Sequence, residues 1–192
     1  MIRIENVGKL FQAHAELLNV VERELSGRIV EAAECLVVTY KAGGKVLLCG
    51  NGGSAADAQH LAGEFVGRFQ LERKALPALA LHADTSILTS IANDYGYEQT
   101  FARQVQAWGQ EGDTLIAIST SGGAANVNHA VRLARDLGLR TIGLTGRDGG
   151  ELAGLVEIPL IIPAQPTARI QEMHILIGHI LCDVVERELF AE

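Results

Sequence analysis

The sequence predicts an α/β fold: a five-stranded parallel sheet flanked by helices, with extra helices before the first strand. Two observations support this prediction. From residue 44 onward, short apolar segments of strand length alternate with segments whose apolar residues recur at a helical period. The chain also has 192 residues and 48% hydrophobic content, which is enough to bury one core. We therefore expect a single domain over residues 1–192.

The first 43 residues predict two helices. Apolar residues between Ile4 and Leu25 recur at a period of roughly 3.6, as in an amphipathic helix. A second helical pattern covers Ile29 to Lys41 and ends at Gly43-Gly44, a typical helix stop. We expect residues 1–43 to pack in an oligomer, and residues 44–192 to form the α/β core and the last helix.

Five apolar segments have the length of buried strands, and helical patterns separate most of them. The last predicted helix, Thr167 to Leu189, is long enough to reach beyond one subunit, which favours oligomerisation through helices. The predicted strands are Val46 to Cys49, Ala78 to Leu81, Leu115 to Ile118, Thr141 to Leu144 and Glu157 to Ile162.

One loop is a candidate phosphate cradle. The run Ser119-Thr120-Ser121-Gly122-Gly123 lies between the strand-like segment Thr114 to Ile118 and a helical pattern that begins near Ala124. Hydroxyls and the first free N–H groups of a helix would converge there, the helix dipole favours an anion, and glycine lets a ligand approach the backbone. The alternative is an ordinary strand-to-helix turn, because Ser, Thr and Gly are common helix caps.

A second loop has the same character. The run Cys49-Gly50-Asn51-Gly52-Gly53-Ser54 ends the strand-like segment Lys45 to Leu48 and opens the helical pattern Ala55 to Phe69. In an open parallel sheet, the loops at the carboxyl ends of the strands face one side, so both loops can line one crevice. Together they predict a sugar-phosphate site. Neither loop matches a dinucleotide or P-loop fingerprint, which disfavours NAD and ATP.

Composition excludes several classes of partner. A net charge of −7 argues against binding to a nucleic-acid backbone, which needs a basic face. Cys35, Cys49 and Cys182 lie in apolar stretches without Cys-x-x-Cys spacing and are interpreted as reduced core thiols, so we expect a cytoplasmic protein. The sequence shows neither a leader-like start nor an apolar run of about 20 residues, so we expect no processing and no membrane span.

Two helical segments carry candidate proton-handling or metal-binding residues. His60 and Glu64 are four residues apart and therefore lie on one face of a helix, where they could share a metal or a proton. The alternative is a partly buried histidine beside a solvated carboxylate.

The last helix adds Gln171, Glu172, His174 and His179 within an apolar run. At about 100° per residue, Gln171 is within about 80° of His179, whereas His174 is about 140° away and is the weaker candidate. Glu172 is closer in angle than Gln171, so spacing alone does not choose between them. The alternative is a core helix with two hydrogen-bonded histidines.

Several polar residues have competing explanations. Asn93-Asp94 follows an apolar stretch and Asp84 follows a predicted strand, yet all three are also common turn and cap residues. Asp57 and Gln59, near the start of the helix that carries His60, could be first-turn partners of the helix dipole and nothing more. The run from Gly146 to Gly150 is typical of a flexible turn.

Taken together, the motifs resemble the phosphoheptose isomerases of the sugar-isomerase (SIS) fold. The resemblance covers nearly the whole chain and rests on Cys49–Ser54, the helix through His60 and Glu64, Asn93-Asp94, Ser119-Thr120-Ser121-Gly122, Gly143-Leu144-Thr145-Gly146 and Arg169-Ile170-Gln171-Glu172. It implies a three-layer, flavodoxin-like SIS domain and a homotetramer. It also implies conversion of sedoheptulose 7-phosphate to D-glycero-D-manno-heptose 7-phosphate through an enediol, the first committed step toward the heptoses of bacterial lipopolysaccharide.

The resemblance further implies residue roles, carried across by matching motif. One zinc ion per subunit would be held by His60, Glu64, Gln171 and His179, and the base and acid would be Glu64 and His179. The implied substrate contacts are Asn51, Gly52, Gly53, Glu64, Asn93, Asp94, Ser119, Thr120, Ser121 and Gln171.

The sequence departs from the family at Gly123-Ala124, where the family usually has Asn followed by Ser. The missing hydroxyl predicts weaker phosphate affinity rather than lost activity, because one hydrogen bond is worth roughly 0.5–1.5 kcal/mol.

Two other classes of protein share the fold. The first is a non-catalytic tetramer that binds a bacterial replication initiator; its relatives share the Arg169–His174 run but tend to lack the carboxylate that this chain has at Glu64. The second is a sugar-phosphate sensor that regulates transcription, which the absence of a basic DNA-binding segment disfavours. The sequence favours the enzyme.

Overall fold

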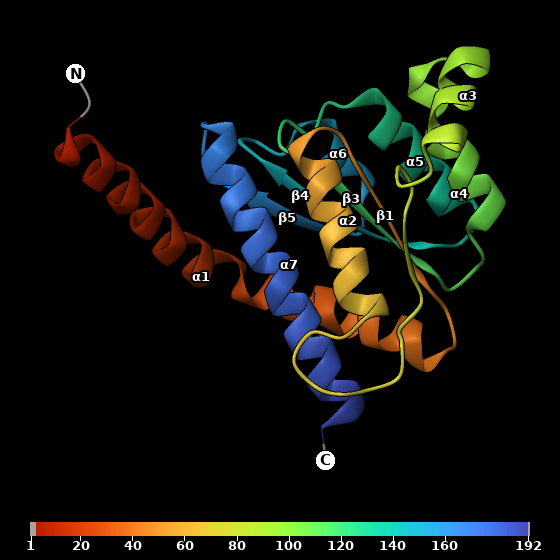
Figure 1. Ribbon diagram of the computed structural model, residues 1–192, viewed down its shortest axis with the longest axis horizontal. Helices are drawn as coiled ribbons and strands as arrows, with labels where there is room; N and C mark the ends of the chain where they lie inside the picture. Colours follow the sequence, from red (N-terminus) through yellow and green to blue (C-terminus); the bar gives the residue numbers. More distant parts are fainter. Residues whose placement is uncertain (1–2, 192) are drawn as a thin grey trace.

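The computed structural model describes residues 3–191, so the two ends of the predicted 1–192 domain lie outside the described residues. The chain opens with a long helix, α1 (Ile4–Lys41), and closes with another, α7 (Thr167–Phe190). Figure 1 shows α7 lying along the body of the molecule while the N-terminal part of α1 extends away from it. Between them lie β1 (Val46–Gly50), α2 (Gly53–Val66), β2 (Ala78–Ala80), α3 (Thr85–Tyr95), the 3₁₀ helix η1 (Tyr97–Gln99), α4 (Ala102–Trp108), β3 (Thr114–Ser119), α5 (Ala125–Asp136), β4 (Arg140–Gly146), α6 (Gly150–Leu155) and β5 (Ile158–Ile162).

The five strands form one parallel sheet in the order β2-β1-β3-β4-β5, which confirms the predicted α/β class and strand positions to within a residue or two. The chain leaves β1 to one side for β2 and returns to the other side for β3. The strand order therefore reverses between β1 and β3, and at such a switch point the loops leaving the two strands diverge and open a crevice. Those are the two loops that the sequence singled out.

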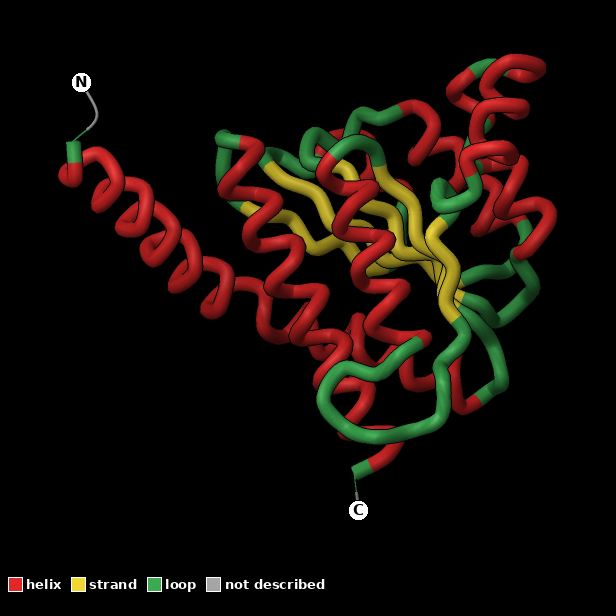
Figure 2. The backbone as a smooth tube through the Cα atoms, viewed as in Figure 1, coloured by secondary structure: helices red, strands yellow, loops and turns green. Residues whose placement is uncertain are grey.

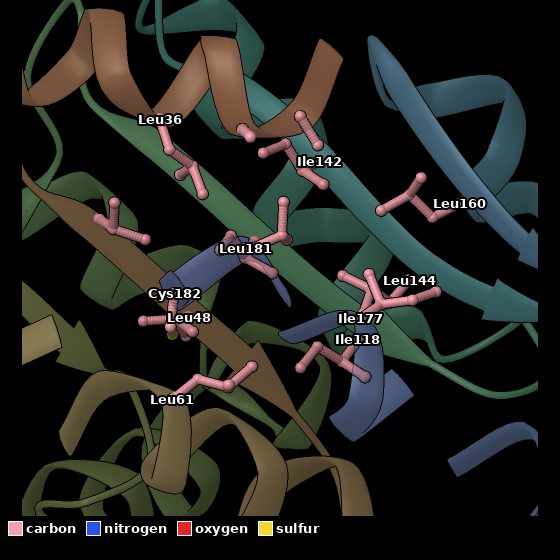
Figure 3. Packing of buried hydrophobic residues seen from close by; sticks show 14 of the residues in the cluster. Leu36, Leu48, Leu61, Ile118, Ile142, Leu144, Leu160, Ile177, Leu181 and Cys182 are labelled. Carbon is pink, nitrogen blue, oxygen red and sulfur yellow. The ribbon is translucent and has the colours of Figure 1, made fainter. Parts of the chain in front are cut away.

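The core consists of two apolar layers, one on each face of the sheet. Side chains alternate along each strand, so Val46 and Leu48 face one layer while Leu47 and Cys49 face the other. The first layer packs α1, α2 and α7 against the sheet, and the second packs α4, α5 and α6. Figure 2 shows the sheet between the helices, and Figure 3 shows the first layer close up, where Leu61 and Leu181 meet strand residues.

The prediction of two N-terminal helices was wrong, because residues 4–41 form one helix. Ser26 and Gly27, which lie between the two predicted helices, are helical and exposed. Arg28 Nη1 pairs with Glu31 Oε2 at 2.7 Å across the same region. A glycine inside a helix costs only about 1 kcal/mol relative to alanine, which does not stop a helix that is favourable on both sides.

The two halves of α1 have different surroundings. Its second half buries Ile29, Leu36 and Val37 in the first apolar layer, so this part of the predicted oligomer segment belongs to the core of its own chain. Its first half carries Val7, Leu10 and Phe11 in the open, with Phe11 74% exposed. A row of apolar side chains therefore remains uncovered on the projecting part of α1.

Cys49 and Cys182 are buried free thiols and Cys35 is half-buried and free, as predicted for core cysteines. Within residues 3–191, none of the helices combines the length and the apolar character that crossing a bilayer requires.

Replacing Gly27 by Ala tests the continuity of α1. A Cβ at Gly27 would meet no atom within 4 Å, and alanine restricts the unfolded chain more than glycine. Gly27→Ala should therefore raise the free energy of unfolding by about 0.5–1 kcal/mol, measured by thermal unfolding with circular dichroism. A lower stability would mean that the helix is interrupted here.

Candidate active site

The two Gly/Ser loops enclose one small pocket at the carboxyl edge of the sheet, as the sequence predicted. The pocket holds about 170 Å³, and both loops contribute polar side chains to its wall. The helix α5 begins beside it: its cap residue, Ala124, lines the pocket and provides no side-chain hydrogen bond to the helix. The lining residues are Asn51, Ser54, Ile118, Ser119, Thr120, Ser121 and Ala124.

The cradle loop needs glycine at position 122. Gly122 has φ +66°, and a Cβ there would overlap the Gly149 carbonyl. The Gly122 carbonyl also accepts hydrogen bonds from Leu152 N at 2.9 Å and from Asn128 Nδ2 at 3.2 Å. The prediction that residues 146–150 form only a flexible turn was therefore incomplete, because this segment packs directly against the cradle and fixes its shape.

Asn51 is held in place by residues that the sequence analysis missed. Its side-chain amide pairs reciprocally with that of Asn126 through two hydrogen bonds of 2.9 Å, and Tyr97 Oη donates to Asn51 Oδ1 at 2.9 Å. Two of the polar functions of Asn51 are thus engaged within the protein. The signal in the sequence was the position of Asn126 at the start of the helix after the cradle.

A second group of polar residues lies where α2 and α7 meet. His60 Nε2 and His179 Nε2 share a hydrogen bond of 2.8 Å, and His60 Nε2 lies 3.4 Å from Glu64 Oε1. The two imidazole rings meet edge to face, and Phe69 stacks on His179 with ring centroids 5.6 Å apart. Residues 119 positions apart thus form one cluster, which the sequence placed on two separate helices.

The helices can meet because one of them presents a glycine. A Cβ on Gly178 would lie 2.6 Å from both Leu61 methyl carbons, and Leu61 is itself buried. No side chain larger than hydrogen fits between α2 and α7 unless Leu61 moves. Gly178 directly precedes His179 and Leu61 directly follows His60, so the close approach brings the two histidines together.

Asp57, one turn before His60 on α2, is a residue whose role the sequence understated. Its Oδ2 is buried and has no hydrogen-bond partner among residues 3–191. Burial raises the pKa of the Asp57 carboxyl, while His60 and His179 act in the opposite direction. The prediction of a helix-dipole partner alone did not anticipate a buried carboxylate oxygen without a partner in the described part of the chain, whose pKa both histidines lower.

The structure separates the two candidates on the last helix that spacing had left open. Gln171 touches the first loop, since a Cβ on Gly53 would overlap its side-chain amide. Glu172 instead faces the N-terminal helix, with its Oε2 at 2.8 Å from His14 Nδ1 and its Oε1 at 2.5 Å from Arg169 Nη2. Gln171 is therefore the residue that lies at the site.

His174 lies apart from the cluster. Its Nε2–H donates to the Thr145 carbonyl at 3.0 Å, and burial lowers its pKa to about 4 although that hydrogen bond opposes the change. It is a neutral core histidine, in agreement with its weaker standing in the sequence.

Asn93 and Asp94 are not part of the pocket wall. Both are exposed on α3, where Asn93 Nδ2 donates to Asp94 Oδ1 at 2.7 Å. Asp84 accepts from Ile87 N at 2.9 Å and caps the start of α3, which agrees with the cap alternative.

The donor chemistry of the cluster fits a zinc ion, which binds imidazole nitrogen and carboxylate oxygen. Within residues 3–191, no group of three or more His, Cys, Asp or Glu side chains is arranged to hold a metal. What the structure brings together is the histidine pair, with Glu64 beside His60. This pair is positioned to share a proton.

Known proteins resemble the chain over nearly its whole length. The model of the SIS domain family matches residues 9–146. A phosphoheptose isomerase of Citrifermentans bemidjiense is 56% identical over 94% of each chain, and one from Roseiflexus sp. is 59% identical over 85% of this chain and 83% of its own. This chain belongs to the phosphoheptose isomerases of the SIS domain family. A solved phosphoheptose isomerase from Neisseria gonorrhoeae has a TM-score of 0.90 at 45% identity, covering 95% of this chain and 97% of its own.

A second solved phosphoheptose isomerase, from Francisella tularensis, has a TM-score of 0.93 at 39% identity and covers 97% of this chain and all of its own. The chain is therefore an isomerase of sugar phosphates rather than a non-catalytic relative of the same fold. The predicted family and the predicted SIS fold are both confirmed.

A buried ion pair joins α7 to the loop after α2, near the histidine cluster of this isomerase. Glu186 on α7 and Arg73 in the loop after α2 are both 1% exposed, and Arg73 Nε lies 2.7 Å from Glu186 Oε2. Burial alone would raise the pKa of Glu186, but hydrogen bonds from the Leu71, Phe69 and Gln70 backbone and from Arg73 lower it to about 2.

Gly122→Ala should weaken sugar-phosphate binding in this isomerase by about tenfold or more. A positive φ costs an alanine about 1–2 kcal/mol, and its methyl group would displace the loop that carries Gly149. Isothermal titration calorimetry measures the effect. Gly123→Ala is the matched control, because a Cβ there meets only Ser121 Oγ at 3.7 Å, and its affinity should stay within about twofold. Equal affinities for both variants would contradict the rigid cradle.

The lowered pKa of Glu186 predicts an acid dependence of stability. The unfolded carboxyl takes up its proton near 4.5 and the folded one near 2, so the stabilisation is complete above pH 4.5 and is lost as pH falls toward 2. Replacing Glu186 by Gln should lower the free energy of unfolding at pH 7 by about 3–5 kcal/mol and flatten its pH dependence in that window. Urea unfolding at several pH values measures both. Glu188→Gln, at an exposed neighbour, is the control.

Proposed function

We propose that the enzyme interconverts sedoheptulose 7-phosphate and D-glycero-D-manno-heptose 7-phosphate through an enediol. The observation that carries this proposal is the meeting of His60, Glu64 and His179 between α2 and α7, while Gln171 of α7 touches the first loop of the phosphate pocket. A sugar phosphate anchored by its phosphate group in a pocket at the switch point extends its other end toward neighbouring side chains.

Glu64 and His179 supply the proton transfers. Moving a carbonyl between carbons 2 and 1 requires a base that removes a proton from one carbon and returns it to the next. Glu64 serves as that base, with its side chain 24% exposed and its Oε1 beside His60. His179 gives and takes a proton, which assists ring opening and the transfer between the two substrate oxygens.

The proposed binding contacts come from the pocket and from residues outside its wall. Ser119, Thr120 and Ser121 hold the phosphate together with the first N–H groups of α5. Asn51 lines the pocket from the opposite loop, and Gly52 and Gly53, which follow it in that loop, contact the sugar phosphate. Gln171 orients the sugar from its place against Gly53. Asn93 and Asp94 complete the contact set from α3. Ala124 offers no hydroxyl, which weakens the phosphate anchor without removing it.

Zinc belongs to the proposal as one ion per subunit. His60, Glu64, Gln171 and His179 would hold it, and the bound cation would supply a Lewis acid for the oxygens on which charge develops. The exposed apolar row on α1 supports a homotetramer in which helices of neighbouring subunits cover one another. We further propose a cytoplasmic enzyme that serves lipopolysaccharide heptose biosynthesis.

Incubation with sedoheptulose 7-phosphate, followed by NMR, tests the reaction. The signals of an aldoheptose phosphate should appear, with and without added zinc as parallel arms. Glu64→Gln should lower kcat by about 10²–10⁴-fold while leaving sugar-phosphate affinity within about threefold, because it removes the base and keeps the shape.

His179→Ala should lower kcat and also reduce zinc retention, measured by mass spectrometry of the purified protein. Glu188→Gln serves as a surface control. Full activity in Glu64→Gln would remove that residue from the mechanism, and absence of turnover in the wild type despite saturable binding would contradict the proposed substrate.

A further inference from the structure

The loop between α2 and β2 is held by one carboxylate. Glu186 Oε1 accepts hydrogen bonds from Gln70 N at 2.6 Å and Leu71 N at 2.5 Å, and Oε2 accepts from Phe69 N at 2.9 Å. Three consecutive backbone N–H groups thus converge on a side chain from α7. Figure 1 shows this loop, in yellow, passing along the bottom of the molecule near the lower end of α7.

The cationic partner holds the end of the preceding helix. Arg73 Nη2 donates to the Glu64 carbonyl at 2.9 Å, and Nη1 donates to the carbonyls of Phe65 at 2.9 Å and Lys74 at 3.0 Å. The last carbonyls of a helix lack partners within the helix, and a cation there is favourable to the dipole. α2 has no basic residue in its own last turn, so Arg73 supplies it from the loop.

Each member of this ion pair is connected to one of the candidate catalytic residues, Glu64 or His179. Glu64 lies in the last turn of α2, and its own carbonyl is one of the atoms that Arg73 binds. His179 is two helical turns before Glu186 on α7. Phe69, whose N–H binds Glu186, stacks its ring on the His179 imidazole.

We propose that the Arg73–Glu186 ion pair positions Glu64 and His179 for proton transfer. The pair fixes the end of α2 against α7, and through Phe69 it sets the plane of the His179 ring. Both residues are positioning residues, since neither reaches the candidate substrate pocket. This proposal rests on the function proposed above, in which Glu64 and His179 exchange protons with the substrate.

Stability alone does not account for the pair. Removing two charges from water offsets most of their attraction, and buried ion pairs are often no more stabilising than apolar side chains of the same volume. The pair instead fixes how α2 and α7 are placed relative to each other. The planar guanidinium of Arg73 is bonded at three nitrogen atoms and the carboxylate of Glu186 at both oxygens, and this set of bonds allows one arrangement of the two helices. Misplacement by about 1 Å can lower a rate by about 100-fold.

Kinetics of Glu186→Gln and Arg73→Lys test the proposal on the full-length protein. The first variant keeps the shape of the side chain and removes its charge. The second keeps the charge but not the planar fork that reaches the α2 carbonyls. Each should lower kcat for sedoheptulose 7-phosphate by about tenfold or more, with KM changed by less than about threefold.

Asp113→Asn is the matched control. Asp113 is also a buried carboxylate that accepts backbone N–H groups, from Lys45 at 2.9 Å and Gln110 at 2.9 Å, and pairs with Lys45 Nζ at 2.6 Å. It precedes β3, at the end of the sheet opposite the pocket. This variant should lose melting temperature to a similar extent while keeping kcat within about twofold.

A second measurement is independent of turnover. In ¹H–¹⁵N spectra of the imidazoles, Glu186→Gln should shift the His179 signals, because Phe69 no longer holds its place on the ring. Asp113→Asn should leave them unchanged. If Glu186→Gln does not fold, Arg73→Lys is judged by the same two measurements.

These experiments distinguish a failure of the positioning role of Arg73 and Glu186 from a failure of the proposed isomerase reaction. If the wild type does not isomerise the sugar phosphate, the proposed function fails, and the positioning pair is then judged by the His179 signals alone. If the wild type is active, the positioning role is overturned by unchanged kcat in the variants, by unchanged His179 signals, or by a loss of kcat in Asp113→Asn that matches its loss of melting temperature.

Discussion

The close contact between α2 and α7 is the constraint on which the candidate active site depends. Gly178 leaves room for Leu61, so the two helices approach more closely than larger side chains would allow. The neighbours of these two residues are His179 and His60, and the helical geometry places both imidazoles on the same side of the contact. One backbone choice, a glycine in an apolar helix, therefore decides whether the two histidines can share a hydrogen bond of 2.8 Å.

The sheet contributes the other half of the site. Because the strand order reverses between β1 and β3, the loops that follow them diverge and leave a pocket where the N-terminus of α5 begins. Glycines at 122, 149 and 150 let the cradle loop and the segment before α6 touch backbone to backbone. The pocket is thus a rigid feature of the framework, and Gln171 links it to the helix pair by lying against Gly53.

The two polar centres differ in how they are supported. The cradle is held mainly by backbone contacts and by the amide pair of Asn51 and Asn126. The histidine cluster is held from below by charge, through Arg73 and Glu186, which join the end of α2 to α7 across a loop that the sequence had predicted as helix up to Phe69. The helix ends at Val66 because the carbonyls of its last turn bond to Arg73 instead of to further helical N–H groups.

The sequence by itself determined the fold class, the strands, the cradle and the helix positions of His60, Glu64 and His179. Those predictions depend on local periodicity and on the rule that the loops following the strands of a parallel sheet share an edge. Both use only patterns of neighbouring residues in the sequence. The tertiary structure alone decided that α1 is one helix and that Asp57 Oδ2 is buried without a partner among residues 3–191. It separated Gln171 from Glu172, which helical spacing could not do. It also placed Arg73 on Glu186 and the segment at residues 146–150 against Gly122. These contacts join residues that are far apart in the chain. Their separation along the sequence does not indicate the contacts, because only tertiary packing brings the residues within bonding distance.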